Sequence, residues 1–173
     1  YTPTHTLSLH DALPISTDAS STDAGARAIA VLPFDTLGAA QTSFTDGMHG
    51  DLLTRLSSIA DVQVISRTSV LQYRHANTTV QQIAQELGVK WVLEGEVQVA
   101  GDQVQVNARL VDAQTDRQAW AEDYRRPLTA ENLFRIQGAI TKEIAHALKA
   151  TLTPTEKKQV EQRPTENLAA YRL

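Results

Sequence analysis

The chain has 173 residues, of which 42% are hydrophobic and 21% charged, which suits one ordinary globular domain with flanking segments. Its net charge of −4 argues against a nucleic-acid-binding face, which would be basic. The absence of cysteine excludes disulfides, thiol catalysis and zinc fingers, and no run reaches the roughly 18–20 apolar residues of a membrane span.

Residues 1–15 differ in character from the rest of the chain and match neither a signal peptide nor a transit peptide. Their stretch TLSLHDALPI resembles a short-read sequencing adapter translated codon by codon. We therefore expect natural sequence to begin near Ser16, and we expect no role for His5 or His10. Residues 16–26 are rich in small polar residues and lack a hydrophobic period, which predicts a flexible linker.

The folded domain is expected to span residues 27–153 and to begin with a strand. Arg27–Phe34 is apolar on both faces, as in a central strand, and Asp35–Thr42 is expected to be a loop. The next segment has apolar residues at helical spacing, which predicts one buried helix face: Phe44, Met48, Leu52, Leu53, Leu56 and Ile59. The alternative N-cap residues of this helix are Ser43, Thr45 and Asp46.

A second strand and two shorter helices are predicted next. Val62–Ser66 has the composition of a strand, and Ser66–Ser69 offers cap residues for a short helix extending to about Tyr73. Asn77–Thr79 is another group of cap residues, and the apolar positions after it predict a helix that ends at Gly88. The helical connection between the first two strands favours a parallel pair with a right-handed crossover.

The next three strands are predicted to form an antiparallel meander. Val89–Ala100 and Gln103–Asp112 are joined by Gly101-Asp102, a two-residue turn typical of a hairpin. That turn predicts which residues lie opposite one another on the inward face: Val99 and Val104, Val97 and Val106, and Leu93 and Leu110. The outward pairs are Glu94 with Arg109 and Glu96 with Asn107. The last strand is expected at Gln118–Tyr124.

The longest predicted helix is Glu131–Leu152, whose apolar residues form one stripe and which Pro154 ends. Residues 154–173 are expected to be a polar linker and the start of a helix that the chain end truncates. The element order βαβ(α)αβββα predicts an α/β fold. Its mixed sheet would combine a parallel first pair with a C-terminal antiparallel meander, and the helices would pack on the sheet.

Motifs for catalysis or cofactor binding are absent from the sequence. It has no phosphate-binding glycine loop, no His-Glu-x-x-His and no Gly-x-Ser-x-Gly. His49, His75 and His146 fall on separate predicted elements, and we expect them to be ordinary surface or capping residues. We therefore expect no catalytic residue, no metal and no cofactor in this chain.

Two groups of polar residues follow the first two strands, at the edge where open α/β sheets bind ligands. Asp46 and Gly47 could help to hold a cation or a polar ligand. Arg67, Thr68 and Ser69 could hold an anion at a helix N-terminus. The alternative, which the residue types favour, is that these side chains cap their helices and stabilise the helix dipole. These five residues form the candidate ligand-binding site.

Six segments of the chain together resemble one known family. They are IAVLPF at 29–34, FTDGM at 44–48, VISRTS at 64–69, ELGVKWVLEG at 86–95, VNARLVD at 106–112 and WAEDY at 120–124. In order and spacing they resemble the TolB amino-terminal-like domain, which is related to FlgO and CsgG, over about residues 27–152. In that family the domain usually follows a membrane helix and a cytoplasmic output domain, such as an adenylate cyclase or a winged-helix domain. A tetratricopeptide array usually comes after it.

The resemblance implies a non-catalytic interaction or sensory module of a bacterial signalling protein, which binds a protein partner or itself. It implies a periplasmic location, with a cytoplasmic one as the alternative, and membrane contact only through segments outside this chain. Residues 154–173 would begin the repeat array. Two alternatives stay open, a small-ligand or anion receptor and an envelope assembly subunit of the CsgG or FlgO kind. We expect no nucleic-acid contact by this domain.

Overall fold

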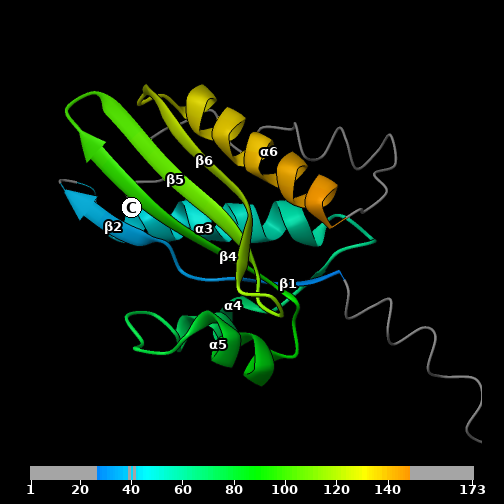
Figure 1. Ribbon diagram of the computed structural model, residues 1–173. Coiled ribbons are helices and arrows are strands. Elements are labelled where there is room, and N and C mark those ends of the chain that lie inside the picture. Colours follow the sequence, from blue (N-terminus) through cyan, green and yellow to red (C-terminus); the bar gives the residue numbers. More distant parts are fainter. Residues whose placement is uncertain (1–26, 39, 41, 149–173) are drawn as a thin grey trace, which may run out of the picture.

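The computed structural model describes residues 27–38, 40 and 42–148 (Figure 1). The predicted adapter, linker and truncated helix, at residues 1–15, 16–26 and 154–173, lie outside the described residues. The strands are β1 (Ala28–Val31), β2 (Asp35–Gly38), β3 (Gln63–Val64), β4 (Trp91–Ala100), β5 (Gln103–Asp112) and β6 (Arg117–Pro127). The helices are α3 (Thr42–Ser57), α4 (Arg67–Leu71), α5 (Val80–Leu87) and α6 (Ala130–Ala147).

The strands of the described residues form one mixed sheet in the order β3-β1-β4-β5-β6, and β2 also pairs with β4. β1 runs parallel to β3 and β4, and β2 runs parallel to β4. β4, β5 and β6 form the antiparallel meander. The predicted α/β fold, with a parallel first pair and helices packed on a mixed sheet, is therefore confirmed.

The register predicted for the hairpin is confirmed at each predicted position. Val99 lies opposite Val104, and Glu94 lies opposite Arg109, as the Gly101-Asp102 turn requires. The inward valines at positions 97, 104 and 106 are fully buried. The last strand extends beyond the predicted end at Tyr124 to Pro127, because β5 offers pairing partners along its whole length.

The predicted loop at Asp35–Thr42 is wrong. Asp35–Gly38 is strand β2, and α3 begins at Thr42, so that Ser43, Thr45 and Asp46 lie inside the helix instead of at its N-cap. The first strand is also shorter than predicted, because β1 ends at Val31. The cause lies in β4, which has ten residues and pairs with β1 only over Trp91–Leu93. The remaining edge of β4, at Glu96–Val99, pairs with Asp35–Gly38, a segment that has little strand character of its own.

Helices cover the two faces of the sheet unequally. α3 and α6 pack on one face over the larger core, which includes Ile29, Leu93 and Leu110. On the opposite face α4 and α5 cover a smaller core around Ala30 and Val92. Figure 1 shows α4 and α5 gathered near β1, well away from the turn between β4 and β5. Within residues 27–148, as far as the structure describes them, the distal part of β4, β5 and β6 therefore has a helix layer on one face only.

The ends of α4 and α5 follow the predicted capping chemistry. Ser66 caps α4, and Thr79 caps α5 in a capping box with Gln82. Gly88 ends α5 in the left-handed conformation, with a φ of 69°. The predicted apolar stripe of the last helix is buried from Leu133 to Leu148 except for the half-buried Ala147, and its remaining member, Leu152, lies outside the described residues.

Gly95 supplies a first test of this packing. A Cβ atom added at Gly95 would lie 2.7 Å from the ring of Phe34, which is itself buried. We expect Gly95→Ala to lower the free energy of unfolding in urea by about 1–3 kcal/mol, because the tightly packed ring has no space to move. Combining it with Phe34→Leu should cost less than the sum of the single changes. Unchanged stability of Gly95→Ala would contradict this account.

Candidate functional site

The predicted ligand-binding residues lie where α3 passes the start of α4. Asp46 and Gly47 belong to α3, and Arg67, Thr68 and Ser69 are the first residues of α4. The two groups approach each other, since a Cβ atom at Gly50, one turn after Asp46, would lie 3.5 Å from Nη1 of Arg67. The structure therefore brings the arginine of one group close to the helix that carries the other.

Two of the predicted side chains, those of Asp46 and Ser69, have partners within the domain. Oδ1 of Asp46 forms an ion pair of 2.5 Å with Nη2 of Arg74, which follows α4. The hydroxyl of Ser66 accepts a hydrogen bond of 3.4 Å from the backbone N–H of Ser69, and the two hydroxyls are 3.0 Å apart. Thr68 is exposed. Ser66 and Ser69 thus join in the capping that the residue types favour, whereas Asp46 holds the segment after α4.

His49 differs from the surface or capping residue that we predicted. Its side chain is 1% exposed, and Nε2–H donates a hydrogen bond of 2.9 Å to the carbonyl of Val31, at the end of β1. Burial holds the pKa of His49 below its usual value, the hydrogen bond opposes that shift, and the nearby charge of Arg67 adds to it. Among the described residues, Nδ1 of His49 has no hydrogen-bond partner. His75 and His146 are exposed, as predicted.

The sequence did not predict the burial of His49, because a histidine in an amphipathic helix is usually assigned to the polar, exposed face. A usable signal was its spacing, since His49 directly follows Met48 and stands three residues before Leu52 on the buried side of α3. Within the ranges that the structure covers, no three histidine, aspartate or glutamate side chains are placed to hold a metal ion. The helices of those ranges are also too short or too polar to cross a membrane.

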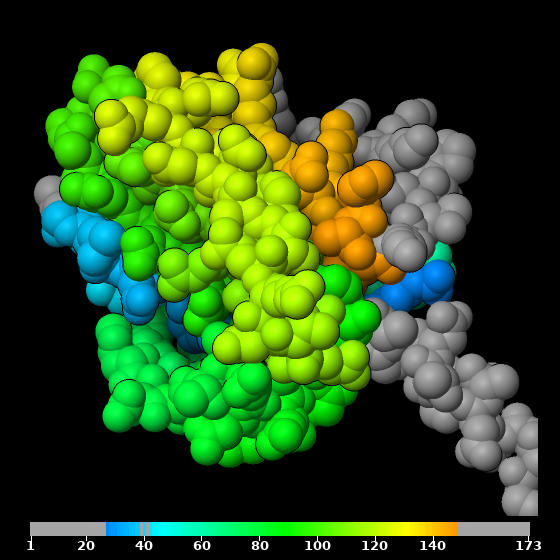
Figure 2. Space-filling model, viewed as in Figure 1, coloured from blue at the N-terminus to red at the C-terminus, as the bar shows by residue number. Residues whose placement is uncertain are grey.

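A second candidate surface is the uncovered face of the meander. We call it the open face, and it consists of Glu94, Glu96, Gln98, Gln105, Asn107, Arg109, Asp123 and Arg125. Figure 2 shows this side of the molecule, with the strands in green and yellow at the surface. Gln98, Asp123 and Arg125 are exposed, and the other five are half-buried. The open face is polar throughout and carries charges of both signs.

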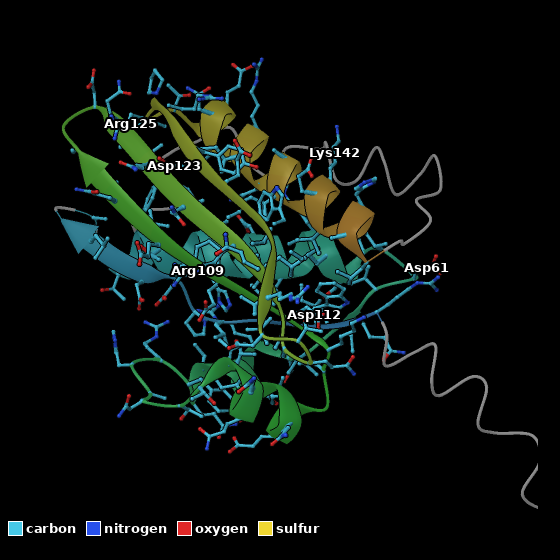
Figure 3. The ribbon with its side chains drawn as sticks, in the orientation of Figure 1. Asp61, Arg109, Asp112, Asp123, Arg125 and Lys142 are labelled. Atoms are coloured by element: carbon cyan, nitrogen blue, oxygen red, sulfur yellow. The ribbon has the colours of Figure 1, made fainter. Side chains whose placement is uncertain are left out.

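Hydrogen bonds connect neighbouring strands across the open face. Nε of Arg109 donates to Oε2 of Glu94 at 2.9 Å, and this contact raises the pKa of Arg109. Gln105 donates to both carboxylate oxygens of Asp123, at 3.0 and 3.1 Å, and accepts from Nη2 of Arg125 at 2.9 Å. Figure 3 labels Arg109, Asp123 and Arg125 on their strands. These bonds fix the side chains of the open face relative to one another.

Two further features border the open face. A hollow of about 330 Å³ lies beside the hairpin turn, lined by Gln98, Ala100, Gln103, Gln105 and Arg125. At the far side, β6 is the outer strand of the sheet, and its residues are exposed except for the half-buried Trp120 and Tyr124. Burial and the neighbouring Glu122 and Glu143 raise the pKa of Tyr124 to about 12. The surface and the strand edge together offer both side-chain and backbone contacts.

Comparison with known families identifies one match over most of the chain. The family described as HilA/YgeH-like transcriptional regulator, second domain, matches residues 25–147. The protein named "Putative adenylate cyclase 3" of Rhizobium meliloti (strain 1021) is 37% identical over 147 residues. The alignment covers 84% of this chain and 25% of the relative, so the chain spans about a quarter of that protein.

Two solved structures share the fold. TolB from Acinetobacter baumannii superposes with a TM-score of 0.54 at 20% identity, over 70% of this chain and 28% of TolB. The lipoprotein GNA1162 from Neisseria meningitidis superposes with a TM-score of 0.52 at 21% identity, over 69% of this chain and 96% of the lipoprotein. The resemblance to TolB is thereby confirmed as a resemblance of fold.

The burial of His49 predicts a pH dependence of stability. Since its folded-state pKa is lowered, only the unfolded chain binds a proton as the pH falls below about 6.5, and stability should be lost in that range. We expect His49→Leu to remove this pH-dependent loss of stability. It should also cost about 1–3 kcal/mol at neutral pH, because the carbonyl of Val31 loses its donor.

Urea unfolding of the wild type and of His49→Leu at neutral and mildly acidic pH measures both effects. His146→Leu is the matched control, because His146 is exposed on α6. An equal pH dependence in the wild type and in His49→Leu would contradict the assignment of a depressed pKa to His49.

Proposed function

The chain belongs to the family of second domains of HilA/YgeH-like transcriptional regulators, and on that premise we propose that it is a non-catalytic interaction module of a bacterial signalling protein. In this proposal it links a membrane-anchored output domain to a helical repeat array. The module corresponds to residues 27–153, residues 16–26 are the linker, and residues 154–173 lead into the array. The domain acts by binding and transmits the position of its partner through α6.

The observation that supports this function is the open face together with the outer edge of β6, which no other strand of the described residues pairs with. A sheet covered on both faces and at both edges would have little left to offer a partner. Here the distal meander has a helix layer on one face only, and the other face is polar and ordered by its own hydrogen bonds. Non-obligate protein interfaces have this mixed polar character, and exposed strand edges bind extended partners.

The output activity belongs, in this proposal, to parts of the protein outside this chain. The cyclase relative is about four times as long as the matched segment, which leaves room for separate catalytic and membrane segments. The shared fold with a lipoprotein is compatible with an extracytoplasmic position of the domain. In a transcriptional regulator of this family, a DNA-binding domain would take the place of the cyclase as the output domain.

A test of this function uses the cyclase relative at full length. We expect Gln105→Glu with Arg125→Glu, at the equivalent positions, to change cyclic AMP formation in cells several-fold, because both residues lie on the open face. The activity of the purified cyclase domain alone should be unaffected. Gln81→Glu with Gln85→Glu, at exposed positions of α5, is the matched control. Formation of cyclic AMP from ATP by the present chain itself would overturn the proposal.

A second candidate is the anion receptor formed by the predicted residues, and the observation that favours it is the surroundings of His49. Arg67 and Arg74 both act electrostatically on this buried ring, whose Nδ1 has no partner among the residues described. Asp46 opposes an anion there, because it already neutralises Arg74. The receptor would therefore depend mainly on Arg67, with Gly47, Thr68 and Ser69 around it.

Inorganic phosphate is the probe for this second function. We expect it to shift the NMR signals of the His49 ring and to release measurable heat on titration. Arg67→Ala should abolish both responses, whereas Arg117→Ala, at an exposed position of β6, should leave them intact. Unchanged His49 signals at saturating phosphate would rule the receptor out.

A further inference from the structure

We propose that two copies of this domain pair through the outer edges of their β6 strands, antiparallel and centred on Tyr124, to form a two-fold symmetric dimer. The two sheets become one continuous sheet. This inference rests on the proposed interaction function and deepens it, because it names both the binding surface and the partner. It is carried by the free edge of β6 and by the order of the charges along it.

The outer edge of β6 is open to backbone pairing except at two positions. The carbonyl of Arg125 accepts a hydrogen bond of 2.7 Å from Nη1 of Arg126, which a second strand would replace, and Pro127 has no N–H to donate. β6 has eleven residues, and in the part of the sheet that the structure describes it is hydrogen-bonded to β5 alone. α6 packs on the inner face of the sheet and contacts Trp120 and Tyr124 from there, while the neighbouring residues of the strand are exposed. A row of outward N–H and C=O groups on a long edge strand is a template for a further strand. Figure 1 shows β6 running the full height of the sheet.

The charges on β6 are ordered so that they favour a second copy of the same strand. Glu122 and Asp123 precede Tyr124, and Arg125 and Arg126 follow it. When two such strands run antiparallel about Tyr124, Asp123 lies opposite Arg125 of the second copy, and Glu122 lies opposite Arg126. The symmetry produces each pair twice. Edge strands that avoid association commonly carry charges of one sign, which repel a second copy, whereas this arrangement attracts one.

The same charges select a single register. A two-fold axis perpendicular to the sheet keeps each side chain on its own face, so only residues of the same face can lie opposite one another. The nearest alternative registers that obey this condition place Asp123 against Asp123 or Arg125 against Arg125. Both alternatives bring like charges together, and only the register centred on Tyr124 matches all four charged residues. In that register Trp120 also lies opposite Leu128.

The contacts within one copy orient the charged side chains for this pairing. On the open face, Gln105 holds the carboxylate of Asp123 and the guanidinium of Arg125 next to each other, through bonds of 2.9 to 3.1 Å. Each group retains further hydrogen-bonding capacity, because a guanidinium has five N–H donors and a carboxylate has about four acceptor sites. The side chains are therefore positioned on the strand before the second copy arrives.

Complementary charge reversal tests the proposal. We expect the wild-type chain to sediment as a dimer that dissociates as salt is raised, because its ion pairs are exposed. Glu122→Arg with Asp123→Arg makes one all-basic strand, and Arg125→Asp with Arg126→Glu makes one all-acidic strand. Each variant alone should be monomeric, and an equimolar mixture of the two should form a heterodimer. Gln81→Arg with Gln85→Arg, on α5, is the control and should leave the dimer intact.

A cysteine scan tests the register. The chain contains no cysteine, so a single introduced thiol reports on its own symmetry mate. With a short bifunctional maleimide, Tyr124→Cys should cross-link to a covalent dimer. Ala119→Cys should not, because its two copies would lie ten positions apart, about 34 Å.

The outcomes separate this proposal from the function on which it rests. A monomeric wild type, a variant mixture that stays monomeric, or a ring of more than two copies would each overturn the β6 pairing. A ring would favour the envelope assembly subunit instead. A monomer in which open-face substitutions still change the output of the cyclase relative would preserve the interaction function and reject only the pairing.

Discussion

The long strand β4 is the element on which the rest of the structure depends. On one side it pairs with β5 along its whole length, and on the other it pairs first with β1 and then with β2. This two-sided ladder joins the parallel and the antiparallel parts into one sheet. Gly95, in the middle of the strand, makes the space that Phe34 occupies between the two segments. A slip of β4 by one residue would turn Leu93 and Val97 away from the larger core and separate both halves.

Uneven covering of the sheet follows from this arrangement. The two helices directly before β4, α4 and α5, are short, and they cover only the part of the sheet near β1, where the small core around Val92 lies. The distal meander relies on α3 and α6, both on the other face. The residues left without a helix are polar because they must face water, and they are held by cross-strand pairs such as Glu94 and Arg109. The surface proposed for binding is thus a direct result of where the helices end.

The elements that could be predicted from sequence are those that are determined by residues close together in the chain. The hairpin register follows from a two-residue turn and an alternating pattern, and the caps of α4 and α5 follow from hydroxyl residues at fixed spacing. β2 could not be predicted, since its four residues become a strand only because β4 has a free edge beside them. The burial of His49 likewise depends on the carbonyl of Val31, which a distant part of the chain supplies. Among the predicted ligand-binding residues, Arg67 lies close to the helix that carries Asp46, but the ion pair of Asp46 with Arg74 depends on tertiary packing.

The position of β1 has a consequence for how the domain is made. β1 is synthesised before the other described strands, yet its pairing partner Trp91–Leu93 lies roughly 60 residues later in the chain. During synthesis the apolar run of β1 must therefore remain without that partner, which is the state in which such runs aggregate. The meander, built from local turns, can close by itself as soon as it emerges, because short-range contacts form quickly. β1 is thus synthesised before both of the strands between which it lies in the sheet.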